Sequence, residues 1–398
     1  MQHRVFITGI GIISALGDGK DQTRKALVAG KSGIKKAELL ASKYRDDFPF
    51  GEIPFTSEVL KDRANIADEK GISRTEILAT IAVNQAIADA NLSADHVSNF
   101  GTAFISGSTV GGMSQTENMY HDASDENSAS EFLSSYTLGE HTKNIMRRLH
   151  MKGVSSTFNT ACSSSANAIM YGAKLIKSGR CNRAIVGGAD GLAKYTVNGF
   201  NSLQILSDEL CRPFDQNRKG LNLGEGAAYL ILESEEIVGD KKIYGEVTGY
   251  GNANDAYHAS SISDDAIGII KSISGALKSA NLDESDIDYI NAHGTGTINN
   301  DIAEETGMNK VFSNVPPFQS TKTYTGHTLA SSGAIEAVIC IVAMANNEIY
   351  ASLNCSDPID SYDIKPIERY QDNFSMKHIL SNSFGFGGNC SSLIFSKV

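Results

Sequence analysis

The chain has 398 residues, 41% of them hydrophobic, which is enough for two or three domain-sized units with buried interiors. Lysine and arginine total 35 against 46 aspartates and glutamates, and the formal net charge of -11 excludes binding of nucleic acid or an anionic membrane through overall charge. The six cysteines show no metal-ligand spacing, so we expect no metal site, no disulfide scaffold and a reducing, cytoplasmic location.

The N-terminal run from Val5 is predicted to form a buried strand followed by a glycine turn. Gly9 and Gly11 resemble the start of a dinucleotide-binding loop, but Ser14 stands where the third glycine belongs. A dinucleotide site also needs a second strand with an acidic end, and residues 31–40 are basic and polar instead. No stretch of the sequence is expected to span a bilayer.

Helices and strands then alternate along the first half. Helical periodicity is present at 72–91, and a second helix is predicted at 130–149. Strands are predicted at 99–112, where the run continues into a glycine-rich turn, and at 157–160, 183–188 and 227–233. This alternation predicts an α/β fold with parallel strands covered by helices.

The segment 155–179 is the centre of the chain's organisation. A short strand-like run meets a turn of small residues, and Cys162 then opens a long apolar helix whose start carries Ser163 and Ser164. The unpaired N–H groups and the positive dipole end of a helix N-terminus favour thiolate over thiol. Cys162 is therefore a candidate nucleophile, and an inert buried cysteine is the alternative that these residues alone leave open.

After about residue 235 the order of segments repeats. The run 243–251 opens like the N-terminal strand, and a helical stretch at 265–281 corresponds to the one at 72–91. We therefore expect two halves, 1–235 and 236–398, related by a pseudo-two-fold axis that brings equivalent loops together at the carboxyl ends of strands.

Two histidines of the second half lie in glycine- and threonine-rich turns. His293 follows a predicted strand, and His327 precedes the helix that corresponds to the Cys162 helix. A lone histidine is more often structural than catalytic. Two of them in turns that would face a helix-opening cysteine are a more specific signal for a catalytic site.

These segments together resemble the β-ketoacyl-[acyl carrier protein] synthases, the condensing enzymes of fatty acid and polyketide synthesis, which have the thiolase fold. The resemblance covers nearly the whole chain. It is strongest in four motifs, TACSSS at 160–165, NAHGTGT at 291–297, KTYTGH at 322–327 and NSFGFGG at 382–388. It implies that the two halves form a layered αβαβα core.

The resemblance also implies catalytic roles. Cys162 matches the acylated nucleophile, and His293 and His327 match the paired catalytic histidines. Lys322 matches the lysine that supports them, and Glu304 the acid that pairs with this lysine.

A second set of residues is implied to contact substrate. Thr295 and Thr297 match the hydroxyls that hold the phosphopantetheine arm of the carrier. Phe386 matches a gate residue whose backbone N–H, with that of the nucleophile, forms the oxyanion hole. Beyond this arm, which the carrier brings, no cofactor is expected.

Two segments depart from the family pattern. Lys219, Gly220 and Leu221 stand where bacterial members often have an aromatic residue near the malonyl carboxylate, so Leu221 keeps an apolar wall without the ring. Gln115 and Thr116 stand where a bulky aliphatic residue commonly limits the acyl pocket. The second departure leaves open an unusual primer, such as a polyunsaturated or oxygenated chain.

The expected function is decarboxylative Claisen condensation of an acyl-enzyme thioester with malonyl-[acyl carrier protein] in fatty acid biosynthesis. The alternative is a ketosynthase of a specialised polyene or polyketide pathway, paired with a chain-length partner. An inactive partner subunit would usually lack the nucleophile. A thiolase would need a second cysteine in a cysteine-glycine turn, and Cys390 is followed by a strand-like run instead.

The expected macromolecular partners are an acyl carrier protein and a second subunit, with a homodimer preferred and a heterodimer left open. Carrier proteins are acidic, as this chain is, so docking should depend on local cations. Candidates by clustering alone are Lys61, Arg63, Arg74, Arg147, Arg148 and Lys152.

Overall fold

The computed structural model describes residues 3–115, 119, 130, 133, 135–361 and 364–398. Within these residues the long strands form one mixed sheet made of two similar five-stranded halves. The first half has the spatial order β1-β8-β7-β5-β6, with β1 at Val5–Ser14, β5 at Thr102–Gly107, β6 at Ser155–Phe158, β7 at Arg183–Asp190 and β8 at Gly226–Ser234. The second has the order β9-β13-β12-β10-β11, with β9 at Gly245–Asn254, β10 at Tyr289–Asn291, β11 at Phe318–Gln319, β12 at His378–Gly385 and β13 at Asn389–Ser396.

Strand for strand, the two orders correspond: β1 with β9, β8 with β13, β7 with β12, β5 with β10, and β6 with β11. The halves meet where β1 pairs with β9, at Phe6–Glu246 and Ile7–Gly245. The predicted pseudo-two-fold repeat is confirmed. The turn between the halves lies between the end of β8 at Ser234 and the start of β9 at Gly245.

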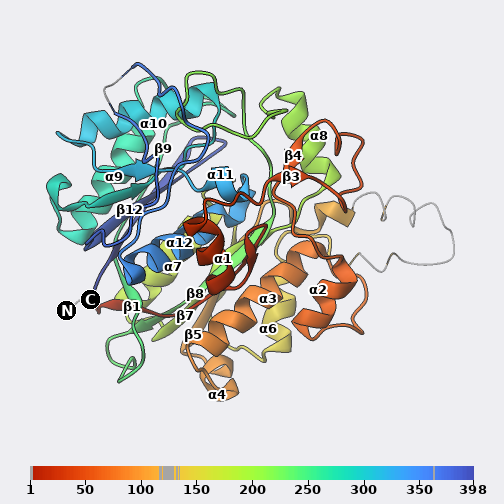
Figure 1. Ribbon diagram of the computed structural model, residues 1–398. Helices are drawn as coiled ribbons and strands as arrows, with labels where there is room; N and C mark the ends of the chain where they lie inside the picture. Colours follow the sequence, from red (N-terminus) through yellow and green to blue (C-terminus); the bar gives the residue numbers. More distant parts are fainter. Residues whose placement is uncertain (1–2, 116–118, 120–129, 131–132, 134, 362–363) are drawn as a thin grey trace.

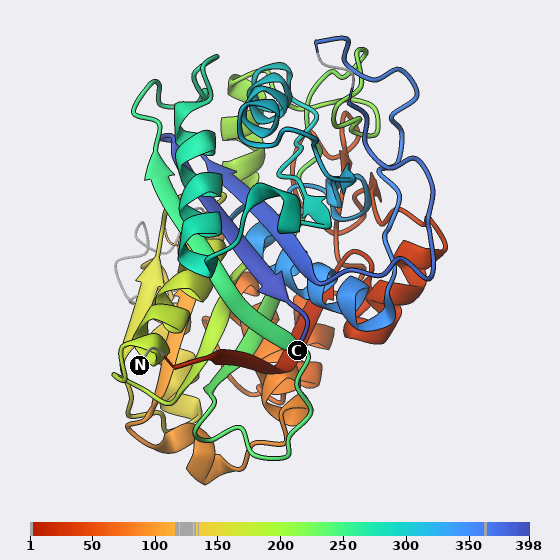
Figure 2. The same ribbon diagram turned by 90° about the vertical axis from the view of Figure 1, so that its left-hand side faces the viewer.

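Helices complete the layers (Figures 1 and 2). The central layer consists of α7 (Ser164–Lys177) and α12 (Ser332–Asn346), which pack against both halves of the sheet in one apolar core. The outer layers are α3 (Arg74–Asp89) on the first half and α9 (Ile267–Ala280) with α10 (Ile298–Val311) on the second. This is the expected αβαβα arrangement.

Smaller elements surround this core. The remaining helices are α1 (Lys20–Val28), α2 (Ser57–Ala64), α4 (Ala94–Ser98), α6 (Glu140–Arg148), α8 (Lys194–Ser202) and α11 (Lys322–Thr325). The short strands are β2 (Gly17–Asp18), β3 (Lys35–Lys36) and β4 (Pro49–Phe50), and the 3₁₀ turns are η1 (Gly111–Gln115), η2 (Glu284–Asp286) and η3 (Leu329–Ser331). The helix predicted at 130–149 is shorter than expected, because α6 begins only after Gly139.

The predicted parallel pairing is correct for part of the sheet and wrong for the rest. Parallel pairs occur around β5 and β10, whereas β8 is antiparallel to both its neighbours and β13 is antiparallel to β12 and β9. The antiparallel pairing of β12 with β13 has a local cause. Gly387 and Gly388 have φ angles of 82° and 78°, so the chain reverses in a tight turn and needs no crossover helix.

Among the residues that the structure describes, one segment is long and apolar enough to cross a membrane by composition, Leu329–Asn346, contrary to the expectation that none would be. Its environment explains the composition, because 89% of the segment is buried inside the protein. It comprises η3 and α12, and α12 is covered on both sides by sheet. Such burial is typical of a core helix in a soluble protein.

Candidate active site

Cys162 lies in the turn between β6 and α7, two residues before the helix begins. The preceding residue, Ala161, has a φ of 51°, a left-handed conformation that turns the chain sharply and projects the next side chain out of the turn. The end of β12 packs against this turn. A Cβ added to Gly385 would lie 2.4 Å from the carbonyl oxygen of Thr160, so only glycine permits this approach.

The Cys162 sulfur is buried, and burial raises the pKa of its thiol to about 12. The Lys322 ammonium and the backbone N–H groups of Phe386 and Cys162 act in the opposite direction, but they do not outweigh the loss of hydration. Burial of the sulfur thus opposes the thiolate that the helix terminus favours. The thiolate at Cys162 stays a prediction.

A pH profile checks this protonation state. With the pKa raised, the reactive thiolate fraction of Cys162 should grow about tenfold for each pH unit between pH 7 and 9, without a plateau. The rate of Cys162 alkylation by iodoacetamide, followed by peptide mass spectrometry, measures it, with Cys162→Ala giving the background from the other cysteines. A rate that is already level at pH 7 would show a resting thiolate.

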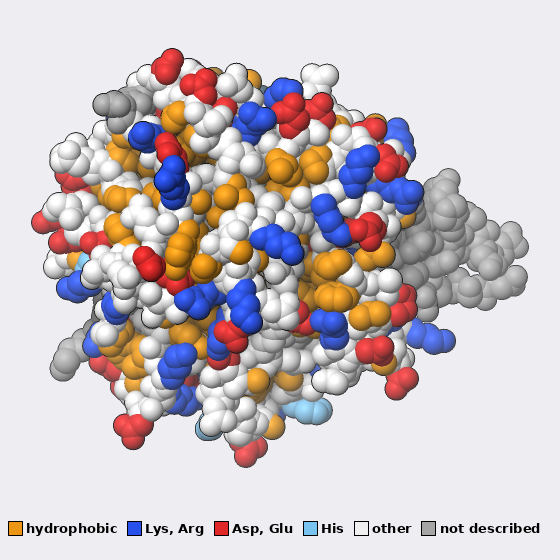
Figure 3. Space-filling view, viewed as in Figure 1, with side chains coloured by type: hydrophobic (Ala, Val, Ile, Leu, Met, Phe, Trp, Pro, Cys, Tyr) orange, Lys and Arg blue, Asp and Glu red, His pale blue; other side chains and the backbone are white. Residues whose placement is uncertain are grey.

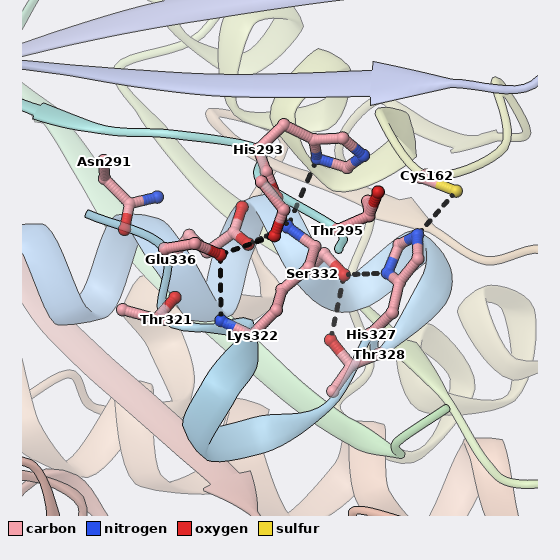
Figure 4. Close-up of polar contacts among 12 residues, drawn as sticks. Cys162, Asn291, His293, Thr295, Thr321, Lys322, His327, Thr328, Ser332 and Glu336 are labelled. Atoms are coloured by element: carbon pink, nitrogen blue, oxygen red, sulfur yellow. Dashed lines mark hydrogen bonds and ion pairs between the residues drawn. The ribbon is translucent and has the colours of Figure 1, made fainter. Parts of the chain in front are cut away.

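His327 faces the Cys162 sulfur from the second half of the chain. Its Nε2 lies 3.0 Å from Sγ, and its Nδ1 lies 3.0 Å from the Ser332 hydroxyl (Figure 4). Nδ1 also accepts a hydrogen bond of 3.3 Å from the Leu329 N–H. Because Nδ1 is an acceptor, the proton of the neutral ring is on Nε2 and points into the site. The ring position is fixed by the backbone, since His327 N–H donates to Asn222 O at 2.7 Å.

His293 follows β10 and presents a second imidazole, with its ring centroid 5.4 Å from that of His327. Its Nδ1 lies 3.2 Å from the Lys322 ammonium, which can only donate, so Nε2 again carries the proton. Burial, and after it Lys322, lowers the pKa of both histidines well below the usual value. The site therefore presents two neutral N–H donors near one thiol.

Lys322, at the start of α11, is buried with its ammonium 2.5 Å from Glu336 Oε1 and 2.5 Å from the His293 carbonyl oxygen. The expectation that it pairs with Glu304 is wrong. The Glu304 carboxylate instead accepts hydrogen bonds of 2.8 Å from the backbone N–H groups of His293 and Gly294. Glu304 thus holds the turn that carries His293, and burial raises its pKa to about 7.

Glu336 is the site residue that sequence reasoning missed. It is the single acidic residue in α12, whose other described side chains are almost all apolar, and burial raises its pKa to about 7 against the opposing effect of Lys322. A lone carboxyl in an apolar helix is a recognisable signal, because a buried charge requires a partner. The sequence did not indicate that Lys322 would be this partner.

A cavity of about 330 Å³ joins these groups to the surface. Cys162, His293 and His327 line its inner end, and the predicted substrate contacts Thr295, Thr297, Leu221 and Phe386 line it too. Phe386 stacks on Phe200 of α8 with ring centroids 5.6 Å apart. The two threonine hydroxyls bond to each other at 2.8 Å.

Of the two predicted acyl-pocket residues, the structure describes Gln115. Gln115 is half-buried in η1 and is not among the described residues that line the cavity. Thr116 lies outside the described residues.

The arrangement can perform acyl transfer and stabilise an enolate. The Cys162 sulfur can attack a thioester, and the N–H groups of Phe386 and Cys162, both directed at the sulfur, can stabilise the resulting oxyanion. The two histidine N–H groups can donate to one carbonyl oxygen. A thiolase fold with one nucleophilic cysteine and two neutral histidines in one cavity defines a condensing type of enzyme.

Comparison with known proteins identifies the family. The N-terminal domain of beta-ketoacyl synthases matches residues 2–237, and their C-terminal domain matches residues 244–356. The chain belongs to the beta-ketoacyl synthase family. A 3-oxoacyl-[acyl-carrier-protein] synthase 2 from Synechocystis is 32% identical over 100% of this chain and 98% of its own length. The protein of the same name from Coxiella burnetii is 29% identical over 100% and 99%.

Solved structures of the family are similar over the full chain. The ishigamide ketosynthase/chain length factor has a TM-score of 0.93 at 28% identity. A beta-ketoacyl synthase from Burkholderia phymatum has a TM-score of 0.86 at 29% identity, and a type II PKS ketosynthase in complex with its acyl-carrier protein has 0.90 at 26%. Each comparison covers 100% of both chains.

Proposed function

We propose that this protein is a 3-oxoacyl-[acyl carrier protein] synthase, an acyltransferase that extends an acyl chain by decarboxylative condensation with malonyl-[acyl carrier protein] in fatty acid biosynthesis. The observation that carries the proposal is the Cys162 thiol, 3.0 Å from the N–H of one neutral histidine and in the same cavity as a second. Full-length similarity to two 3-oxoacyl-[acyl-carrier-protein] synthases supports it.

In the first half-reaction Cys162 takes the acyl group from the carrier thioester. The new bond joins the Cys162 sulfur to the acyl carbon, the bond to the carrier sulfur breaks, and the thiol proton ends on the carrier's departing sulfur. No net proton is consumed. A neutral resting thiol is therefore compatible with turnover, because the proton leaves only as the acyl group arrives.

In the second half-reaction the malonyl thioester loses carbon dioxide, and the electron pair of the broken bond becomes an enolate. The N–H groups of His293 and His327 donate to the enolate oxygen, and preorganised donors stabilise such developing charge strongly. The enolate carbon then attacks the acyl-cysteine carbonyl, and the Cys162 thiolate leaves and takes up one proton. Lys322 orders this network by holding Nδ1 of His293.

The direct test uses purified protein, a saturated medium-chain acyl carrier and malonyl carrier. The expected products are one carbon dioxide per turnover and a 3-oxoacyl carrier that is two carbons longer, which mass spectrometry detects. Acylation of the protein without condensation, or no reaction with either carrier, would contradict the proposal.

The second candidate is a ketosynthase of a specialised pathway, and similarity to the ishigamide ketosynthase/chain length factor favours it. Competition between a saturated and a conjugated acyl carrier of equal length distinguishes the two functions. We expect a higher kcat/KM for the saturated chain, and a preference for the conjugated chain would support the specialised pathway.

The partner subunit is proposed to pair along β6, the strand at the outer edge of the first half. Val154 O accepts a hydrogen bond from Phe104 in β5, and Phe158 O accepts one from Ser108 just after β5. By the alternation of a parallel ladder, Ser155 and Thr157 therefore direct their N–H groups outward. The expected assembly is a homodimer.

Light scattering tests this interface. The unaltered protein should have twice the chain mass, and Ser155→Pro, which removes an outward N–H, should have the mass of one chain. The matched control Ser155→Ala keeps this N–H and should remain a dimer. A dimer that survives Ser155→Pro with unchanged mass would show that another surface is used.

We propose that the carrier protein docks through a small number of lysines and arginines. The proposed location of the protein is the cytoplasm. On the face in Figure 3, lysines and arginines lie among acidic residues rather than in one broad basic area. Two of the cations predicted by clustering are unsuitable, because Arg148 is paired with Glu69 and Glu76 and Arg74 with the buried Glu225. Their charges are already used inside the fold.

A further inference from the structure

Lys219 occupies the outer part of the cavity that contains Cys162. It is exposed, and it is the one lysine or arginine among the described residues that line the cavity. The neighbouring lining residues Ser260, Ser261 and Asn299 offer uncharged polar groups. The cavity therefore has a chemical gradient, from a thiol and imidazoles at its inner end to an ammonium and hydroxyls near the surface.

The loop of Lys219 is in contact with the turn that carries Thr295 and Thr297. A Cβ added to Gly296, between the two threonines, would lie 2.8 Å from the carbonyl oxygen of Gly220, the residue after Lys219. Gly220 itself has a φ of 146° and packs on Ile205, which also lines the cavity. Lys219 is therefore adjacent in sequence to Gly220, which forms part of the cavity wall next to the two threonines expected to hold the phosphopantetheine arm.

We propose that Lys219 binds the phosphate of the phosphopantetheine arm and so selects phosphorylated thioesters. The inference rests on the proposed function, because it takes the arm to enter with its thioester at Cys162. The phosphate is at the opposite end of that arm from the thioester and must lie near the cavity mouth. An ammonium there compensates its negative charge as an ion pair.

Glu209 competes for the same ammonium. Its Oε1 lies 2.8 Å from the Lys219 Nζ, and its other oxygen lies 3.3 Å from Arg212. All three side chains are partly exposed, so the pairs are weak and a phosphate can replace the carboxylate. Removing the Glu209 charge should therefore strengthen phosphate binding, which is the opposite of the effect of removing Lys219.

The experiment measures the rate constant of Cys162 acylation at low substrate concentration with three thioesters of one fatty acid: acyl-phosphopantetheine, acyl-pantetheine without phosphate, and acyl-coenzyme A. The readout is the ratio of the first rate constant to the second. Lys219→Met should lower this ratio about threefold to fivefold, the range for an exposed ion pair, and added salt should lower it in the unaltered protein. Glu209→Gln should raise it.

The matched control is Lys143→Met, since Lys143 is an exposed lysine with a glutamate partner at the same 2.8 Å distance and does not line the cavity. Its ratio should equal that of the unaltered protein. Acyl-coenzyme A, which has the phosphate but no carrier protein, should lose rate with Lys219→Met as acyl-phosphopantetheine does.

The outcomes separate the two proposals. Equal rates for phosphorylated and unphosphorylated thioesters, or a Lys219→Met effect seen only with intact carrier protein, would overturn the phosphate subsite and leave the proposed function standing. No acylation by any thioester or by acyl carrier protein would overturn both.

Discussion

Replacement of Cys162 by alanine is expected to abolish acyl transfer and condensation completely. The described cysteines other than Cys162 do not line the cavity, so no second thiol can take over the acyl group. Intact-protein mass spectrometry after incubation with acyl carrier should show an acyl mass on the unaltered protein and none on Cys162→Ala.

The matched control is Cys181→Ala, because Cys181 is buried and its pKa is raised by burial, but it lies at the start of the β7 region away from the cavity. This variant should gain the acyl mass at the normal rate. An acyl mass on folded Cys162→Ala would mean that another residue is the nucleophile. Circular dichroism establishes that the variant is folded.

Replacement of His293 by alanine is expected to reduce malonyl decarboxylation by about 100- to 1,000-fold, the usual cost of removing one preorganised donor. Acylation of Cys162 should change much less, because the imidazole in contact with the sulfur is His327. Carbon dioxide release from malonyl carrier and acyl mass gain measure the two steps separately.

His327→Ala is the informative comparison. Its Nε2 is 3.0 Å from the sulfur, so this variant should slow both steps, whereas His293→Ala should slow mainly decarboxylation. An equal loss of both steps in His293→Ala would contradict the assignment. It would indicate that His293 activates the thiol.

Short sequence motifs were enough to predict Cys162, His293 and His327, because the local conformation of each depends on a short segment. The Cys162 and His293 turns each follow a strand, and the His327 turn follows α11. All three contain small residues, and the repeat predicted that they would meet. The strands around β8 were assigned the wrong direction, because strand direction depends on connections and not on composition.

The properties that sequence could not supply depend on depth and on contacts between helices. The raised pKa of Cys162 follows from burial, which a helix-opening motif does not reveal. The Lys322–Glu336 pair arises because α11 and the middle of α12 pack together. No spacing rule favoured Glu336 over Glu304, since both are acids in helices that follow a catalytic turn.

The pseudo-two-fold repeat gives this protein two copies of the same turn, one at the catalytic cysteine and one with a structural role. Leu329 has a φ of 57°, three residues before α12, as Ala161 has 51° three residues before α7, so the counterpart of Cys162 is Ala330. The end of β12 places Gly385, which has no side chain, against the Cys162 turn. The end of β7 supplies Asp190, whose carboxylate accepts the Ala330 N–H at 2.9 Å. In the second half, the Asp190 side chain therefore occupies the N–H group of this turn and holds the structure together. In the first half, the corresponding N–H group at Cys162 stays available to the negative charge that forms during the reaction.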